Sequence, residues 1–107
     1  MDKMVTDNEP AFKVLCAIVT PIAKKKHGMI GLYLFGSKAR QTYDEDSDYD
    51  FCLVAPDDYG PMIIGSFLYD LQEVLEKGVD LICEEGLETK PDMMKDVLRD
   101  RRLVFEA

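Results

Sequence analysis

Two aspartates open a short apolar segment of the chain, in an arrangement suited to binding a metal ion. Asp48 and Asp50 stand on either side of Tyr49, and the apolar run FCLVA follows directly. Because residues two apart in a strand point to the same face, their carboxylates are expected to project together. A charge at the start of a buried strand costs free energy unless a partner offsets it. A metal ion is a candidate partner.

A third aspartate stands in a comparable setting. Asp80 is the one acid in the apolar segment VDLIC, residues 79–83. If this segment and the one that starts near Asp50 are neighbouring strands, three carboxylates would converge on one surface. Oxygen ligands of this kind suit Mg²⁺ or Mn²⁺, which take their remaining ligands from water and substrate phosphates. The alternatives for Asp80 are a capping contact or an ion pair with an arginine.

The pair Gly36-Ser37 ends an earlier apolar segment, MIGLYLF. Glycine there would let a phosphate approach the backbone, and residues from Ser37 to Gln41 are expected to begin a helix whose amide N–H groups face the anion. Lys38 and Arg40 add positive charge. With phosphate on one side and metal on the other, the pattern suits phosphoryl or nucleotidyl transfer.

Each feature also has a plain structural interpretation. Gly-Ser after a strand is an ordinary turn, Lys38 can be a surface residue, and the acidic segment 44–46 fits a solvated loop. An EF-hand calcium loop does not fit, because Tyr49 or Phe51 would fall where that loop requires glycine. The features in combination, rather than any one of them, favour a catalytic site.

The elements that must position these residues are short strands alternating with helices. Strands are predicted at residues 29–35, 49–55 and 79–83, because each segment is apolar and bounded by turn-forming residues. The order of elements predicts an α/β (α+β) fold, in which helices pack on a small mixed β-sheet. The strand at 49–55 is expected to lie between the other two, since Asp80 must reach Asp48 and Asp50.

Helical spacing of apolar residues predicts the helices. The first is expected to be capped by Asp7 or Asn8 and split by Pro21. Others are predicted at 62–77 and 91–101, and the second of these should bury Met93, Met94, Val97 and Leu98. The final LVFE is expected to be a tail or a short edge strand.

Composition bounds the class of protein. The 107 residues suit a single domain spanning 1–107, and 47% are apolar, which argues against disorder. No apolar run approaches the roughly 20 residues of a membrane span, and the N-terminus lacks the apolar core of a signal peptide. We therefore expect a cytoplasmic protein with no membrane association.

The net charge limits the kinds of molecule that the protein can bind, and the cysteines and the single histidine have simple structural interpretations. A net charge of −8 argues against stable nucleic-acid binding by charge alone, and it permits a basic protein partner or a metal-loaded acidic pocket. Cys16, Cys52 and Cys83 are widely spaced and odd in number, which indicates buried thiols rather than disulfides or a zinc site. His27 follows three lysines and is expected to be a solvated residue at a helix end.

The segment LFGSKARQTYDEDSDYDFCLV resembles the signature of the polymerase-β-like nucleotidyltransferase superfamily. That signature is an apolar strand, Gly-Ser, a spacer of about ten residues, Asp-x-Asp opening a second strand, and a third acid on a later strand. Here ten residues separate Ser37 from Asp48, and Asp80 takes the third position. The small size and the ending VLRDRRLVFE are most similar to the minimal nucleotidyltransferase (MNT) type. The resemblance runs from about Phe12 to Glu106.

Two positions depart from the common pattern, which reads Gly-Ser-Arg-Ala-Arg-Gly. Lys38 stands in the place of the first arginine and keeps the positive charge, whereas Gln41 stands in the place of the last glycine. The second change can alter the turn after Arg40.

The resemblance implies a metal-dependent nucleotidyltransferase with magnesium or manganese as cofactor. Asp48 and Asp50 would hold one metal ion with the nucleotide phosphates, and all three aspartates would hold a second at the attacking hydroxyl. Asp80 would also help to activate that hydroxyl. Ser37 and the Gly36 backbone would grip the β- and γ-phosphates of ATP or another NTP, beside Lys38 and Arg40.

The resemblance also suggests a partner. Minimal nucleotidyltransferases often accompany a small helical HEPN-type toxin, and some silence it by adenylylation, so an antitoxin that transfers AMP from ATP to a hydroxyl of that toxin is the preferred reading. One alternative is a module that neutralises such a toxin by binding alone. Another is an aminoglycoside-type small-molecule transferase, whose pocket would then need a second copy of the chain in a homo-oligomer.

Overall fold

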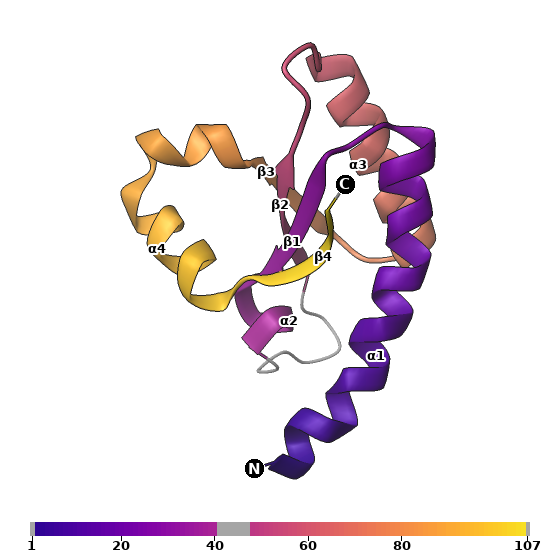
Figure 1. Cartoon of the computed structure of the whole chain (residues 1–107), viewed down its shortest axis with the longest axis vertical. Coiled ribbons are helices and arrows are strands. Elements are labelled where there is room, and N and C mark those ends of the chain that lie inside the picture. Colours follow the sequence, from indigo (N-terminus) through magenta and orange to yellow (C-terminus); the bar gives the residue numbers. More distant parts are fainter. Residues whose placement is uncertain (1, 41–47, 107) are drawn as a thin grey trace.

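A computed structural model describes residues 2–40 and 48–106, with the side chains of 11–36, 38, 39 and 48–106. Four strands form one mixed sheet in the order β3-β2-β1-β4 (Figure 1). Their bounds are β1 (Gly31–Phe35), β2 (Tyr49–Val54), β3 (Val79–Cys83) and β4 (Arg102–Glu106). β1 is antiparallel to β2 and β4, whereas β2 and β3 are parallel. The predicted mixed sheet is confirmed, and β2 lies between β1 and β3 as expected.

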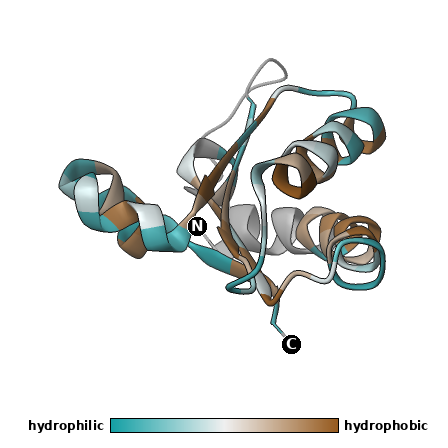
Figure 2. Cartoon of the chain, turned by 90° about the horizontal axis from the view of Figure 1, so that it is seen from above, coloured by the Kyte–Doolittle hydropathy of each residue, from teal (hydrophilic) through white to brown (hydrophobic). Residues whose placement is uncertain are grey.

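Helices cover both faces of this sheet. α1 (Asp2–Thr20) continues into a π-helical segment, η1 (Pro21–Lys26), and lies with α3 (Pro61–Leu75) on one face (Figures 1 and 2). The 3₁₀ helix η2 (Glu84–Thr89) and α4 (Pro91–Asp100) lie on the other. The short α2 (Gly36–Arg40) follows β1 directly, at the end of the sheet. The α-helix ends at Thr20 and the π-helical segment begins at Pro21, so the predicted division of the first helix at this proline is confirmed.

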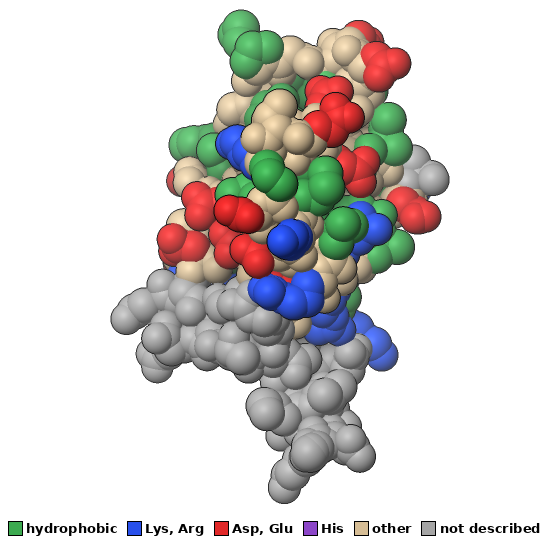
Figure 3. Space-filling model, turned by 90° about the vertical axis from the view of Figure 1, so that its left-hand side faces the viewer, with side chains coloured by type: hydrophobic (Ala, Val, Ile, Leu, Met, Phe, Trp, Pro, Cys, Tyr) green, Lys and Arg blue, Asp and Glu red, His purple; other side chains and the backbone are tan. Residues whose placement is uncertain are grey.

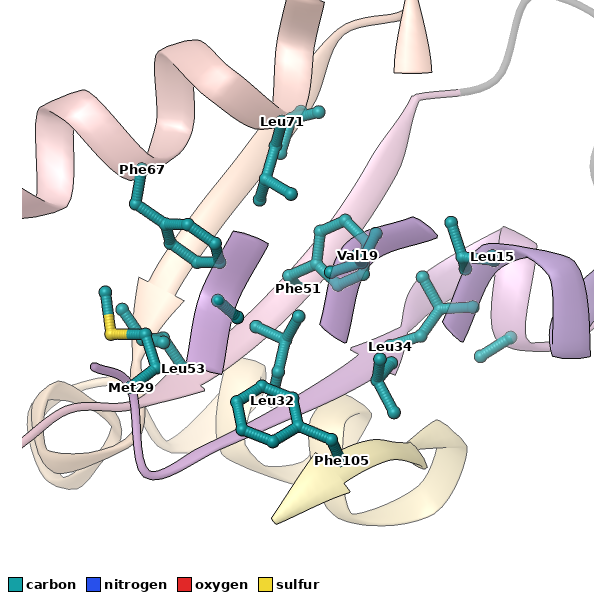
Figure 4. Close-up of a cluster of buried hydrophobic side chains, with 14 residues drawn as sticks. Leu15, Val19, Met29, Leu32, Leu34, Phe51, Leu53, Phe67, Leu71 and Phe105 are labelled. Carbon is teal, nitrogen blue, oxygen red and sulfur yellow. The ribbon is translucent and has the colours of Figure 1, made fainter. Parts of the chain in front are cut away.

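The larger core lies between the sheet and the face formed by α1, η1 and α3. Figure 4 shows Phe67 and Leu71 of α3 directed toward Phe51 and Leu53 of β2, and all four side chains are fully buried. Figure 2 shows the corresponding hydrophobic stripes on the two helices facing the sheet. Fully burying side chains of this size contributes roughly 1.5–3 kcal/mol each, so this core fixes the sheet that carries the acids.

A smaller core lies on the opposite face, under η2 and α4. Phe35, Cys52, Leu87 and Val97 are its buried members. Of the four residues predicted to face inward from α4, Val97 is buried and Met94 packs against this core, but Met93 and Leu98 are 38% and 58% exposed. The prediction for Met93 and Leu98 was wrong, because only one narrow stripe of this short helix meets the sheet.

His27 is not the solvated residue that its position after three lysines suggested. Its side chain is 7% exposed, its Nε2 lies 2.7 Å from Oδ2 of Asp70 on α3, and its ring lies 5.5 Å from that of Phe67. Lys26 also reaches Asp70, at 2.9 Å. Hydrogen bonds from His27 and then Lys26 hold the pKa of the Asp70 carboxyl below its usual value. These contacts join η1 to α3.

Two further expectations differ in detail from the structure, and a third agrees with it. α1 begins at Asp2, so the caps predicted at Asp7 and Asn8 were wrong. No disulfide joins the cysteines, as predicted, yet only Cys52 is fully buried, and burial raises the pKa of its thiol to about 11. The predicted edge strand at the end of the chain is β4. Within the described residues, each helix is too short or too polar to cross a membrane.

Candidate functional site

The three aspartates lie at the same end of two adjacent parallel strands. Asp50 of β2 and Asp80 of β3 are register partners, so their Cα atoms are about one inter-strand spacing, ~4.8 Å, apart. Asp48 immediately precedes β2, and the next residue, Tyr49, donates its N–H to the carbonyl of Gly78 at 3.0 Å. The alternation of side chains puts all three carboxylates on the face covered by α4. Asp48 and Asp80 are exposed, and Asp50 is half-buried.

Two glycines make room for two of these carboxylates. Gly36 has a φ of +76°, and a Cβ on it would overlap the carboxylate of Asp50. A Cβ on Gly78 would lie 2.5 Å from Oδ1 and 2.7 Å from Cγ of Asp48. The sequence suggested that Gly36 lets a phosphate approach the backbone. These contacts indicate that a side chain at either position would displace a carboxylate: Gly36 leaves room for Asp50, and Gly78 leaves room for Asp48.

The helix predicted after Gly36 is present as α2, and of its two basic residues the structure places the side chain of Lys38. Lys38 Nζ lies 4.6 Å from the centre of the Tyr49 ring, and Tyr49 packs against the larger core. Lys38 is therefore held over a residue whose side chain points away from the face of the carboxylates. The side chains of Ser37 and Arg40 lie outside the described part of the structure, as do Asp44, Asp46 and the rest of segment 41–47.

A pocket of about 690 Å³ opens beside two of the acids. The sheet contributes residues of β1, β2 and β3, and Gly36 begins α2; Lys90, Met93 and Asp96 form the α4 wall of the pocket. Its described lining consists of Phe35, Gly36, Asp50, Asp80, Leu81, Ile82, Lys90, Met93 and Asp96. The structure thus brings three of the seven predicted site residues into one pocket, with Asp48 outside its lining.

The donors present fit a hard divalent cation. Carboxylate oxygens are the ligands that Mg²⁺ prefers, and it commonly takes only one or two carboxylates from a protein. Gly36 and Gly78 leave room for the carboxylates of Asp50 and Asp48 on the sheet face that also carries Asp80. Among the described residues, however, no three His, Cys, Asp or Glu side chains are already gathered closely enough to hold a metal. A metal ion here would therefore complete its ligands from water and substrate oxygens.

Sequence reasoning missed the α4 wall of the pocket. Lys90, Met93 and Asp96 are spaced by three, so they share one side of the helix. That spacing was visible in the sequence, but the apolar Met93 was assigned to the core. The polar residues Lys90 and Asp96 on the same side of the helix are the signal that could have assigned Met93 to a pocket wall rather than to the core.

Comparisons with known proteins converge on one family. The model of the family described as polymerase β, nucleotidyltransferase, matches residues 18–107. A sequence search of curated proteins found no match. A solved minimal nucleotidyltransferase is 27% identical, with a TM-score of 0.69, and the match covers 85% of this chain and 93% of that one.

Two solved toxin–antitoxin complexes share the fold. One is a tri-AMPylated Shewanella oneidensis HEPN toxin in complex with an MNT antitoxin; the matched chain is 16% identical, with a TM-score of 0.63 and coverage of 89% of this chain and 73% of that one. The other is a toxin–antitoxin structure with AMP-PNP, 22% identical, with a TM-score of 0.60 and coverage of 74% and 62%. The chain thus spans about three fifths of the length of that match.

Proposed function

Because the chain belongs to the polymerase β nucleotidyltransferase family, we propose that it transfers AMP from ATP to a hydroxyl group of a HEPN-type partner protein. The observation that carries the proposal is the in-register pair of Asp50 and Asp80, with Asp50 seated against Gly36 at the start of a helix. An acid pair beside a strand-to-helix turn suits phosphate and metal chemistry. The toxin–antitoxin complexes among the structural neighbours support the class of partner.

In the proposed reaction the partner's hydroxyl oxygen attacks the α-phosphorus of ATP. A new O–P bond forms, the bond from the α-phosphorus to the bridging oxygen breaks, and pyrophosphate leaves. Divalent metal ions, when bound, would neutralise the phosphate charge and lower the barrier to displacement. Asp48 and Asp50 would hold the nucleotide side of the site with Gly36 and Ser37. Asp80 would orient the hydroxyl and accept its proton at a carboxylate oxygen.

The direct test mixes the purified protein, MgCl₂, α-labelled ATP and the product of the neighbouring gene. Label should move to the partner, and its mass should rise by one AMP. Asp50→Asn is the matched inactive variant, because the amide is isosteric with the carboxylate and still fits against Gly36. It should keep the thermal stability of the wild type and lose metal-dependent nucleotide binding in calorimetry.

The alternatives make different predictions in the same assay. If the wild type suppresses the partner's activity but transfers no label, the chain acts by binding alone. If an added aminoglycoside is labelled and the partner is not, the acceptor is a small molecule. If Asp48→Asn and Asp50→Asn both bind Mg²⁺ and a non-hydrolysable ATP analogue as tightly as wild type, the proposed metal site is wrong.

A further inference from the structure

The cation in the described lining of the pocket comes from an element that the sequence motif does not include. Of the two basic residues of the motif, Lys38 is held over the Tyr49 ring and is absent from the described lining, and the side chain of Arg40 lies outside the described part of the structure. Within the described lining the three acids Asp50, Asp80 and Asp96 are accompanied by one cation, Lys90. Figure 3 views the molecule from the side of η2 and α4, where acidic, basic and hydrophobic side chains are interspersed.

The backbone of Lys90 is fixed, whereas its side chain is exposed. Its N–H donates to the carbonyl of Leu87 at 2.9 Å, and its own carbonyl accepts from the N–H of Met94 at 2.9 Å. Pro91 follows it at the first position of α4. These contacts anchor the Cα between η2 and α4. The ammonium group has no ion pair with any side chain in the described part of the chain.

None of the acids in the described lining of the pocket forms an ion pair with Lys90. Asp96 pairs with Arg99 one turn later on α4, at 3.1 Å. Asp50 and Asp80 line the same pocket from the sheet, on β2 and β3. An ammonium group on a fixed backbone, opposite a cation-binding pair of carboxylates, is suited to an anionic ligand that spans both.

We propose that Lys90 binds a phosphate group of the incoming nucleotide from the α4 wall. The inference rests on the proposed function, because it takes the triphosphate to be the anion that enters beside Gly36 and Asp50. The same residue would then determine nucleotide affinity without touching the reacting hydroxyl. A contact with the acceptor protein is the competing role, and it would leave nucleotide binding unchanged.

The test compares Lys90→Ala, Lys90→Arg and Lys95→Ala by calorimetry with Mg²⁺ and a non-hydrolysable ATP analogue, in the absence of any partner. Lys95 is an exposed lysine of the same helix that is absent from the described pocket lining, so its variant removes the same charge elsewhere. Lys90→Ala should weaken binding of the analogue about tenfold or more, as expected for a lost charged hydrogen bond. Lys90→Arg should retain most affinity, Lys95→Ala should equal wild type, and adenosine should bind all of them equally.

The outcomes separate this inference from the proposed function. If Lys90→Ala binds the analogue like wild type while Asp50→Asn does not, the role of Lys90 is overturned and the nucleotide site stands. Equal losses in Lys90→Ala and Lys95→Ala would also overturn it, since they would reflect overall charge. If Lys90→Ala loses affinity but wild type never labels a partner, the phosphate contact stands and the proposed transfer fails. Thermal unfolding of each variant, whose exposed positions make misfolding a minor risk, verifies the fold.

Discussion

The carboxylate of Asp48 lies against the Cα of Gly78, so closely that a methyl group on that glycine would stand 2.5–2.9 Å from three of its atoms. Asp48 immediately precedes β2, and Gly78 immediately precedes β3. A backbone hydrogen bond also joins the two segments, because the Tyr49 N–H donates to the Gly78 carbonyl. The turn before β3 therefore helps to position the acid that opens β2. This pairing links a residue outside the family signature to one inside it.

Gly78→Ala should lower activity while leaving the fold intact. The new methyl group would push the Asp48 carboxylate aside, and because Asp48 is exposed it can rotate away at little cost in stability. If Asp48 holds a metal ion as proposed, its displacement should cost about tenfold to a hundredfold in rate. Nucleotide transfer and thermal unfolding would be measured side by side, with Gly65→Ala as the control, since nothing lies within 4 Å of its added methyl. Unchanged nucleotide transfer by Gly78→Ala would show that the close contact between Gly78 and Asp48 is not needed for activity.

Gly36→Ala and Gly65→Ala should change stability in opposite directions. Gly36 has a φ of +76° and its added methyl would overlap Asp50, so alanine there should cost on the order of 1–3 kcal/mol. Gly65 is an exposed residue inside α3, where alanine should stabilise by about 0.5–1 kcal/mol. Urea denaturation of both variants measures the difference. A neutral Gly36→Ala would mean that the backbone at this turn relaxes.

Asp80→Asn should separate chemistry from nucleotide binding. Its register partner Asp50 and Asp48 would still hold the nucleotide in the proposed reaction, but the group proposed to accept the proton would be lost. Turnover should fall by roughly 10²-fold or more, with the affinity for Mg²⁺ and an ATP analogue changed far less. Asp58→Asn, an identical change in the exposed loop after β2, is the control. Transfer by Asp80→Asn at the wild-type rate would exclude the assigned role.

The contact of Asp70 with His27 and Lys26 should make stability depend on pH in the acid range. The pKa of Asp70 is lowered from its ordinary 3.8 in the folded protein, so its stabilising contribution is present above that value and disappears as pH falls through the folded pKa. Wild type should be more stable than Asp70→Asn at about pH 5, and the gap should close as pH falls through the lowered pKa of the folded protein. Thermal unfolding at several pH values follows this gap. A constant difference over the range would rule out the ionised contact as its source.

The sequence alone identified the segments that build the sheet and the acids that open two of its strands. A short run of apolar residues is a local signal, and turn-forming residues mark the ends of each segment, so β2 and β3 were predicted within one residue of their observed bounds. The spacing of Gly36, Asp48 and Asp50 is likewise local. These features follow from backbone geometry that every strand shares.

Contacts between distant segments were decided only by the tertiary structure. The in-register pairing of Asp50 with Asp80 depends on which strands become neighbours, and His27 meets Asp70, 43 residues away, because η1 packs against α3. The exposure of Met93 and the placement of Lys90 in the pocket depend on how α4 crosses the sheet. Helical periodicity gives the faces of a helix but not which of them meets a partner, since that choice is made by packing among elements far apart in the chain.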